Sequence, residues 1–385
     1  MNILSIETSC DDTSVSVIKT SGKKRVSLKV LSNIISSQIE VHKEWGGVYP
    51  SLAKREHKKN LIPVFKKSLK KSGFFKKTKE RKINKEKIEE ILEKEPELLE
   101  IFLKEIPKIA KPKIDIISVT EGPGLEPCLW VGINFAKALS SYWGIPIVPV
   151  NHIKGHIYAS FLEKKITLKS VFPAICLVVS GGHTQLMHIK NVNNYKIIGE
   201  TRDDAAGECL DKAARILGLE YPGGPVIEKI SEGHKEREKE IVFPRPMIHS
   251  NNYDFSFSGL KTAVLYNFKK RSKKEKESKE YIQEACFQTQ QAIIDVLIYK
   301  TFKAIKEFKV KSLIIGGGVT ANKKLKKEIK KIAKRDFPKL KLYMPEKKYC
   351  TDNAAMTAAA SYFQYLEKGT KNWKKIKANS GLRIK

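Results

Sequence analysis

Residues 174–189, AICLVVSGGHTQLMHI, contain the pattern that decides the fold. Six consecutive apolar residues at 174–179 predict a buried strand, and the small and polar residues of Ser180–His183 are typical of a turn. Residues 184–189 then predict a strand that returns beside the first. The stretch therefore predicts a β-hairpin with a glycine-rich tip.

A related pattern begins the chain in residues 2–18, NILSIETSCDDTSVSVI. An apolar strand is followed by the polar turn 10–13 and by a segment in which apolar and polar residues alternate strictly. The two hairpins superpose when Thr13 is aligned with Thr184, which favours an internal duplication.

Helical patterns alternate with further strands. Residues 114–120 and 145–150 are short apolar strands on either side of a helical pattern at 131–142, which is β-α-β order. Later, an apolar strand runs into three glycines at 312–318, and residues 322–334 predict an amphipathic helix. The glycines match neither G-x-G-x-x-G nor a Walker A loop, so they identify no particular nucleotide site. The fold class is α/β.

The chain has 385 residues, more than one hydrophobic core usually supports, so we expect two lobes around a central cleft. The predicted boundaries are 1–150 and 151–385, with the final helix and tail returning to the first lobe. Within residues 66–113, Lys blocks alternate with Glu-rich pieces. This composition predicts a solvated insertion at about 74–107, with a salt-bridged surface helix at 88–106, whose deletion leaves a folded protein.

Composition limits the class of protein. Lys and Arg number 73 against 42 Asp and Glu, a net charge of +31, which attracts polyanions and above all nucleic acid. The alternative is that the lysines are spread over the solvent-exposed surface and mark no binding site. The six cysteines form no C-x-x-C pair, which favours reduced thiols. We find neither a signal-peptide pattern nor an apolar run near the ~20 residues of a membrane helix, so we expect a soluble, cytoplasmic protein.

Two histidines suggest a metal site. His152 and His156 are four residues apart, so they lie on one face of a helix and can share an ion. Asp352 could supply an oxygen ligand if the fold brings it there. The spacing alone also occurs incidentally, and the sequence pattern by itself leaves both interpretations open.

Ten motifs stand in a fixed order along the chain. They are IETSCDDT (6–13), GGVYP (46–50), GPGL (122–125), NHIKGH (151–156), SGGHT (180–184), DDAAGE (203–208), YPGGP (221–225), FSFSGLK (255–261), GGGVTAN (316–322) and TDN (351–353). In this order they resemble the bacterial tRNA N6-adenosine threonylcarbamoyltransferase family. The resemblance covers the whole chain except the region 66–113.

The resemblance implies an actin-like, Hsp70-like ATPase fold of two related lobes. It implies an acyltransferase that moves the threonylcarbamoyl group from threonylcarbamoyl-AMP to N6 of adenosine 37 in tRNAs reading ANN codons, forming t6A and releasing AMP. It also implies a paralogous, metal-free partner subunit and a small ATPase, and no membrane.

The resemblance also implies the residues of the site. Metal ligands fall on His152, His156 and Asp352, with one divalent ion per subunit, Fe2+ in preference to Zn2+, although imidazole and carboxylate accept both. We name Asp11, at the first hairpin tip, as the candidate general base. Substrate contacts fall on Val178, Val179, Ser180, Gly181, Gly182, Asp211, Gly224, Glu228 and Asn322.

Two other functions compete. A metallopeptidase could use the histidine pair, but a zincin needs H-E-x-x-H and Ile153 stands where its glutamate belongs. A non-catalytic or sugar-kinase-like ATPase member of the same fold is the second alternative.

Overall fold

In the computed structural model the chain forms two compact units, described at residues 1–232, 234 and 241–384. Unit 1 comprises Met1–Val41, Val48–Ser170 and Asp352–Lys385, and unit 2 comprises His42–Gly47 and Val171–Thr351. Two parts of the predicted second lobe lie outside the described residues. They are Lys385, at the end of the predicted tail, and the segment 233–240 apart from residue 234. The lobe boundary at residue 150 stays a prediction.

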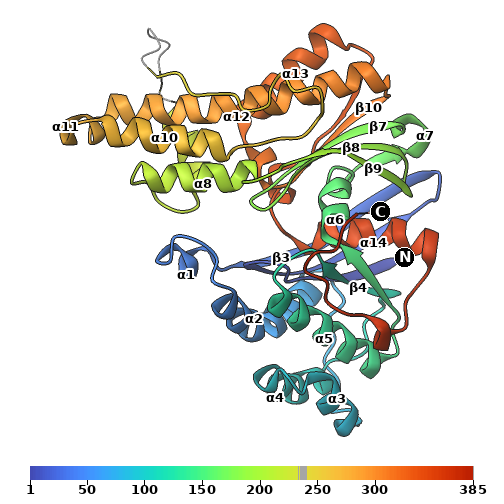
Figure 1. The fold of residues 1–385 in the computed structure, drawn as a ribbon. Helices are drawn as coiled ribbons and strands as arrows, with labels where there is room; N and C mark the ends of the chain where they lie inside the picture. Colours follow the sequence, from blue (N-terminus) through green and yellow to red (C-terminus); the bar gives the residue numbers. More distant parts are fainter. Residues whose placement is uncertain (233, 235–240, 385) are drawn as a thin grey trace. The chain divides into compact units, whose positions relative to one another are not determined.

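Unit 1 is built on a six-stranded sheet of order β5-β4-β1-β2-β3-β6, of which β3 and β4 are labelled in Figure 1. β1 runs antiparallel to β2 and parallel to β4, and β4 runs parallel to β5. The strands are β1 (Asn2–Glu7), β2 (Asp12–Ser21), β3 (Arg25–Ser37), β4 (Ile116–Gly122), β5 (Ile147–Asn151) and β6 (Lys165–Thr167). The helices are α1 (Ile39–Lys43), α2 (Pro50–Lys71), α3 (Lys85–Leu92), α4 (Pro96–Glu105), α5 (Glu126–Trp143), α6 (His152–Ala159) and α14 (Ala354–Lys368), and α1 crosses into unit 2.

The alternation of side chains along β1 assigns its two faces. Leu4 and Ile6 pack into the core that α2 and α5 cover. Ser5 and Glu7 point to the opposite face, as the period of two requires, and both contact α14. The polar side chains of this strand therefore face the helix that follows Asp352.

Unit 2 repeats this arrangement in a five-stranded sheet of order β11-β10-β7-β8-β9. Again the central strand β7 is antiparallel to the next strand in sequence and parallel to a later one, β10. The strands are β7 (Ala174–Val179), β8 (Thr184–Asn191), β9 (Asn194–Glu200), β10 (Ser312–Gly316) and β11 (Lys341–Tyr343). Both predicted hairpins and the α/β class are confirmed, and the shared strand order supports the predicted duplication.

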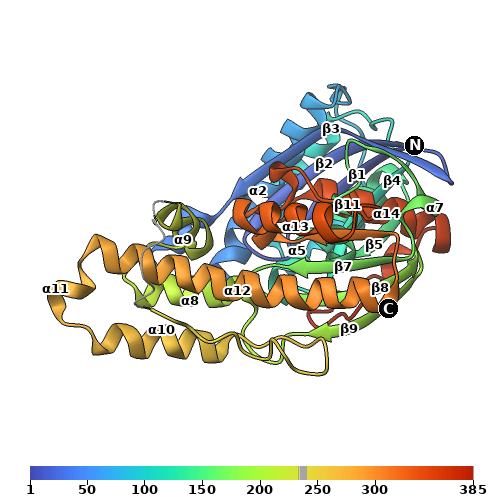
Figure 2. The ribbon, with the colours of Figure 1, turned by 90° about the horizontal axis from the view of Figure 1, so that it is seen from above.

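The helices of unit 2 cover its sheet and extend beyond it. α10 and α12 run side by side and are joined through α11 (Figures 1 and 2). The predicted helix at 322–334 is confirmed as α13. The helices are α8 (Ala206–Ile216), α9 (Gly223–Ser231), α10 (Ser258–Lys270), α11 (Lys273–Lys276), α12 (Lys279–Phe308) and α13 (Lys323–Asp336), while α7 (Leu168–Val171) spans the boundary between the units.

The prediction of one surface helix at 88–106 is wrong. Pro96 begins α4, and a residue before proline avoids the helical conformation, so the chain breaks into α3 and α4. Their apolar residues are part of the core of unit 1: Leu92, Leu98 and Phe102 are fully buried. The segment 74–107 is therefore an integral part of the unit rather than a solvated excursion. The six cysteines are free, as expected.

Candidate active site

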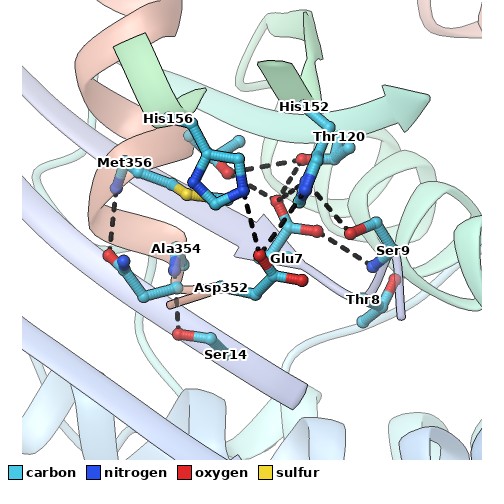
Figure 3. Close-up of polar contacts among 12 residues, drawn as sticks. Glu7, Thr8, Ser9, Ser14, Thr120, His152, His156, Asp352, Ala354 and Met356 are labelled. Atoms are coloured by element: carbon cyan, nitrogen blue, oxygen red, sulfur yellow. Dashed lines mark hydrogen bonds and ion pairs between the residues drawn. The ribbon is translucent and has the colours of Figure 1, made fainter. Parts of the chain in front are cut away.

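The two histidines stand at the start of α6, directly after β5. Asn151 ends the strand, and its Oδ1 accepts hydrogen bonds from the amides of Ile153 (2.9 Å) and Lys154 (3.3 Å), so the helix begins at His152. The rings of His152 and His156 then meet edge to face with centroids 4.7 Å apart (Figure 3).

Asp352 reaches these rings because α14 is anchored to the sheet. Asn353 caps α14 by accepting the amide of Met356 at 3.1 Å, and the amide of Ala354 donates to Ser14 Oγ at 2.9 Å. Asp352 Oδ1 lies 3.2 Å from His156 Nε2 and 3.5 Å from His152 Nε2. Gly155 permits this approach of the two helices, since a Cβ there would be 3.2 Å from Met356 Cγ.

The three side chains fit a metal ion. Their ligand atoms lie within 4.8 Å of one another. His156 is fully buried, and neither of its ring nitrogens makes a hydrogen bond to any described residue. A buried imidazole without such a bond is costly unless another partner satisfies it, and two nitrogens with one carboxylate oxygen suit a divalent transition metal. The predicted ligand set is therefore brought together and could hold an ion.

Acidic groups surround His152. Burial alone would lower its pKa, but the charges of Asp352 and Glu7 raise it to about 9. Its Nδ1 lies 3.1 Å from Ser9 Oγ and 3.7 Å from Glu7 Oε2 (Figure 3). Surroundings that favour a proton on this ring also favour a bound cation.

Glu7 is a fully buried carboxylate that the sequence reasoning missed. It accepts hydrogen bonds from the amide of Ser9 (2.9 Å), from Thr357 Oγ1 (2.8 Å) and from Thr120 Oγ1. Burial by itself would raise the pKa of Glu7, but His152 lowers it below its ordinary value. The available signal was an acidic residue at the end of an apolar strand.

The turn between β1 and β2 carries the candidate base. Asp11 accepts the amide of Gln38 at its carbonyl (3.2 Å), and His57 braces both ends of the turn, contacting Cys10 O at 2.9 Å and Thr13 Oγ1 at 2.7 Å. Burial, then the charges of Asp11 and Asp352, raises the pKa of Asp12 to about 7. Asp12, which the sequence reasoning also missed, therefore shares the electrostatic environment of the predicted base and of a metal ligand.

In unit 2 the glycine-rich turn, where substrate contacts are predicted, follows β7. Val178 and Val179 are fully buried at the end of the strand, and the turn closes with the Ser180 amide donating to His183 O at 2.8 Å. Gly207, at the start of α8, donates to Ser180 O at 3.2 Å. A Cβ on Gly181 or Gly182 would meet nothing within 4 Å, so their backbone is open to a ligand.

The remaining predicted substrate residues meet at two helix starts of unit 2: Asp211 and Glu228 reach the starts of α9 and α13, where Gly224 and Asn322 lie. Asp211 Oδ1 accepts the amide of Gly223 at 2.8 Å, next to Gly224, and Glu228 Oε1 accepts the amide of Lys323 at 2.6 Å. Asn322 Oδ1 caps α13 by accepting the amide of Leu325 at 2.9 Å. Each of these contacts is enough to give its side chain a structural role without a ligand.

β7 and β10 are parallel neighbours, so Val179, which ends β7, and Asn322, which comes after β10, belong to the same edge of the sheet. A Cβ on Gly317, which follows β10, would lie 2.3 Å from Val179 O. The glycine therefore lets the two strand ends approach closely. The glycine-rich turn and the start of α13 belong to one edge.

Asp203 and Asp204 connect two of the sequence motifs. Asp203 accepts hydrogen bonds from Ser258 Oγ (2.7 Å) and from the amide of Phe257 (2.8 Å). Asp204 pairs with Lys212 at 2.7 Å and with Lys261 at 3.1 Å. These carboxylates tie the DDAAGE segment to the FSFSGLK segment.

Comparison with known proteins identifies the family. A family profile described as TsaD, tRNA N6-adenosine threonylcarbamoyltransferase, matches residues 29–80 and 90–359. The chain belongs to this family. The match includes most of the segment 66–113, so our exclusion of that whole region from the resemblance was wrong.

Relatives of the same description match over nearly their full lengths. The chain is 43% identical to the Persephonella marina protein (96% of this chain, 92% of the relative). It is 42% identical to that of Thermosipho africanus, with 100% of both chains covered, and 40% identical to that of Bacillus subtilis, with 100% and 96% covered.

Among solved structures, full-length HypF in its phosphate- and nucleotide-bound form matches with a TM-score of 0.52. The identity is 13%, and the match covers 96% of this chain and 47% of HypF, so it speaks only to the fold. With the paired sheets, it agrees with the actin-like, Hsp70-like class. Within the described residues, every helix is too short or too polar to span a bilayer.

Proposed function

We propose that this chain transfers the threonylcarbamoyl group from threonylcarbamoyl-AMP to N6 of adenosine 37 in tRNAs reading ANN codons. A bond forms between N6 and the carbamoyl carbon, the bond from that carbon to the phosphate oxygen breaks, and AMP leaves while N6 gives up a proton. The observation that carries the proposal is the cluster of His152, His156 and Asp352 in a chain that matches this family over its length.

The three ligands would hold one divalent ion, Fe2+ in preference to Zn2+. Such an ion polarises a carbonyl and neutralises charge on a phosphate. The donor is already an activated mixed anhydride, so positioning and charge stabilisation matter more than a strong nucleophile.

Residues of unit 2 would bind the donor. The exposed backbone of Gly181 and Gly182, with the Ser180 hydroxyl, would suit a phosphate. Val178 and Val179 place this turn, and Asp211 would accept ribose hydroxyls. Gly224, Glu228 and Asn322 would contact the adenylate.

Asp11 would accept the proton from N6. The exocyclic amine of adenosine is a weak nucleophile because its lone pair is delocalised into the ring, so a base near the acceptor helps. Asp11→Asn should leave metal and donor binding intact and slow the transfer. Normal turnover by this variant would remove Asp11 from the mechanism.

The partners follow from the same function. tRNA is the acceptor, and a net charge of +31 favours its binding. We further propose a paralogous, metal-free subunit and a small ATPase as partners, and a cytoplasmic location.

The test supplies purified protein with threonylcarbamoyl-AMP and unmodified tRNA, with and without the two partner proteins. Mass spectrometry of the digested tRNA should show t6A, and His156→Ala should abolish it while the exposed-histidine control His249→Ala does not. Absence of t6A under every condition would exclude the transferase. Cleavage of peptides by the purified protein would instead favour the metallopeptidase alternative.

A further inference from the structure

The two ring nitrogens of His152 have different surroundings. Nε2 faces Asp352 Oδ1 at 3.5 Å, the side shared with His156. Nδ1 faces away from that side, toward Ser9 Oγ at 3.1 Å and Glu7 Oε2 at 3.7 Å (Figure 3). A neutral imidazole can bind metal only through the nitrogen that carries no proton, so the location of the proton decides whether Nε2 can act.

The contact with Ser9 does not decide the tautomer. A hydroxyl can donate to an unprotonated Nδ1 or accept from a protonated one, so either tautomer of His152 satisfies it. Asp352 also acts only as an acceptor, but on the Nε2 side its oxygen would be shared with a bound ion, so the deciding group is an acceptor on the Nδ1 side.

Glu7 is such a group. Its carboxylate is fully buried, and its hydrogen-bond donors across residues 1–232, 234 and 241–384 are neutral: the Ser9 amide, Thr120 Oγ1 and Thr357 Oγ1. These three donors fix its position from the β1–β2 turn, β4 and α14 without cancelling its charge. The anion therefore favours a proton on the nearby Nδ1 over a lone pair there.

We propose that Glu7 is a positioning residue that holds His152 in the Nδ1–H tautomer and so directs the Nε2 lone pair at the metal. His156 has no equivalent support, because its Nδ1 makes no hydrogen bond to any described residue. The neutral ring of His152 is thus held in one tautomer, whereas no described residue fixes the tautomer of His156. This inference rests on the metal site proposed above.

The first experiment measures Zn2+ affinity by competition with a chelator, for the wild type and for Glu7→Gln. Loss of a carboxylate behind a ligating histidine typically weakens metal affinity 10–100-fold, and we expect a loss in that range. The matched control is Glu95→Gln, which neutralises another buried carboxylate of unit 1, one that pairs with Lys54 and Lys58. The control should keep wild-type affinity whatever its effect on stability.

A second measurement needs only the wild type, so it holds even if Glu7→Gln does not fold. Nitrogen-15 NMR of the histidines in Zn2+-loaded protein should show His152 bound through Nε2, with its proton on Nδ1. A proton on Nε2, or Zn2+ affinity within twofold of wild type in folded Glu7→Gln, would overturn the role of Glu7. A wild type that binds no Zn2+ would instead overturn the metal site itself.

Discussion

Replacing Phe102 with alanine tests whether α4 belongs to the core of unit 1. The ring is fully buried and meets Phe135 and Tyr142 edge to face, with centroids 6.1 Å and 6.5 Å apart. Truncating a buried phenylalanine costs about 3–5 kcal/mol, of which each aromatic pair contributes roughly 0.5–1.5 kcal/mol.

The same reasoning applies to removal of the segment 74–107. The deletion would remove five buried Ile, Leu and Phe side chains, each contributing roughly 1.5–3 kcal/mol, from a protein whose whole stability is about 5–15 kcal/mol. We therefore expect the deletion variant not to fold, contrary to the prediction from composition. The five are Ile88, Leu92, Leu98, Phe102 and Ile106.

Tryptophan fluorescence can follow the unfolding of unit 1 alone. Of the four tryptophans, only Trp45 lies in unit 2, so a Trp45→Phe background leaves three reporters in unit 1. Urea unfolding in this background should place Phe102→Ala about 3–5 kcal/mol below its parent. Glu100→Ala, at an exposed position of the same helix, should change stability by less than about 0.5 kcal/mol. Equal stability of the two variants would refute the assignment of α4 to the core.

Three further outcomes are expected. Asp352→Asn should weaken metal affinity and t6A formation together, because an amide oxygen lacks the charge of the ligand it replaces; elemental analysis and the transfer assay check this. Burial lowers the pKa of Lys300 to about 8, so between pH 8 and 10.5 the unfolded state binds more protons than the folded state. The free energy of unfolding should therefore rise with pH over this range, by at most roughly 3 kcal/mol. Urea titrations of the wild type and of Lys300→Met, which lacks the amine, check this. tRNA affinity should fall linearly with log salt, with a slope of roughly −0.9 per neutralised phosphate in duplex regions, and a flat dependence would mean that the charge is only surface solvation.

The hairpins and the β-α-β unit could be predicted because their signals are local. Alternation, apolar runs and turn residues act within a few positions of one another, and β1 and β7 lie where these signals placed them. The error at 88–106 came from giving charge more weight than apolar spacing. Ile88 with Leu92, and Leu98 with Phe102, are i, i+4 pairs on either side of Pro96, which predict two core-facing helices.

The site was only partly within reach of sequence reasoning. Its ligands were named from the family resemblance, and the structure brings those three together. The role of Glu7 could not be predicted, because it depends on Thr120 and Thr357, which reach the same carboxylate from distant parts of the chain. Burial of a glutamate is a property of the assembled fold rather than of its neighbours in sequence.

The division of unit 1 into separate chain segments has a consequence for the order of events during synthesis. His152 and His156 leave the ribosome early, whereas Asp352 belongs to the last segment, beyond nearly all of unit 2. At 5–20 residues per second, the intervening stretch of about 200 residues takes roughly 10–40 s to translate. Throughout that interval the nascent chain offers a metal only two of its three ligands. The full set of three side chains is therefore assembled only after Asp352 has been translated, with α14 as its last element.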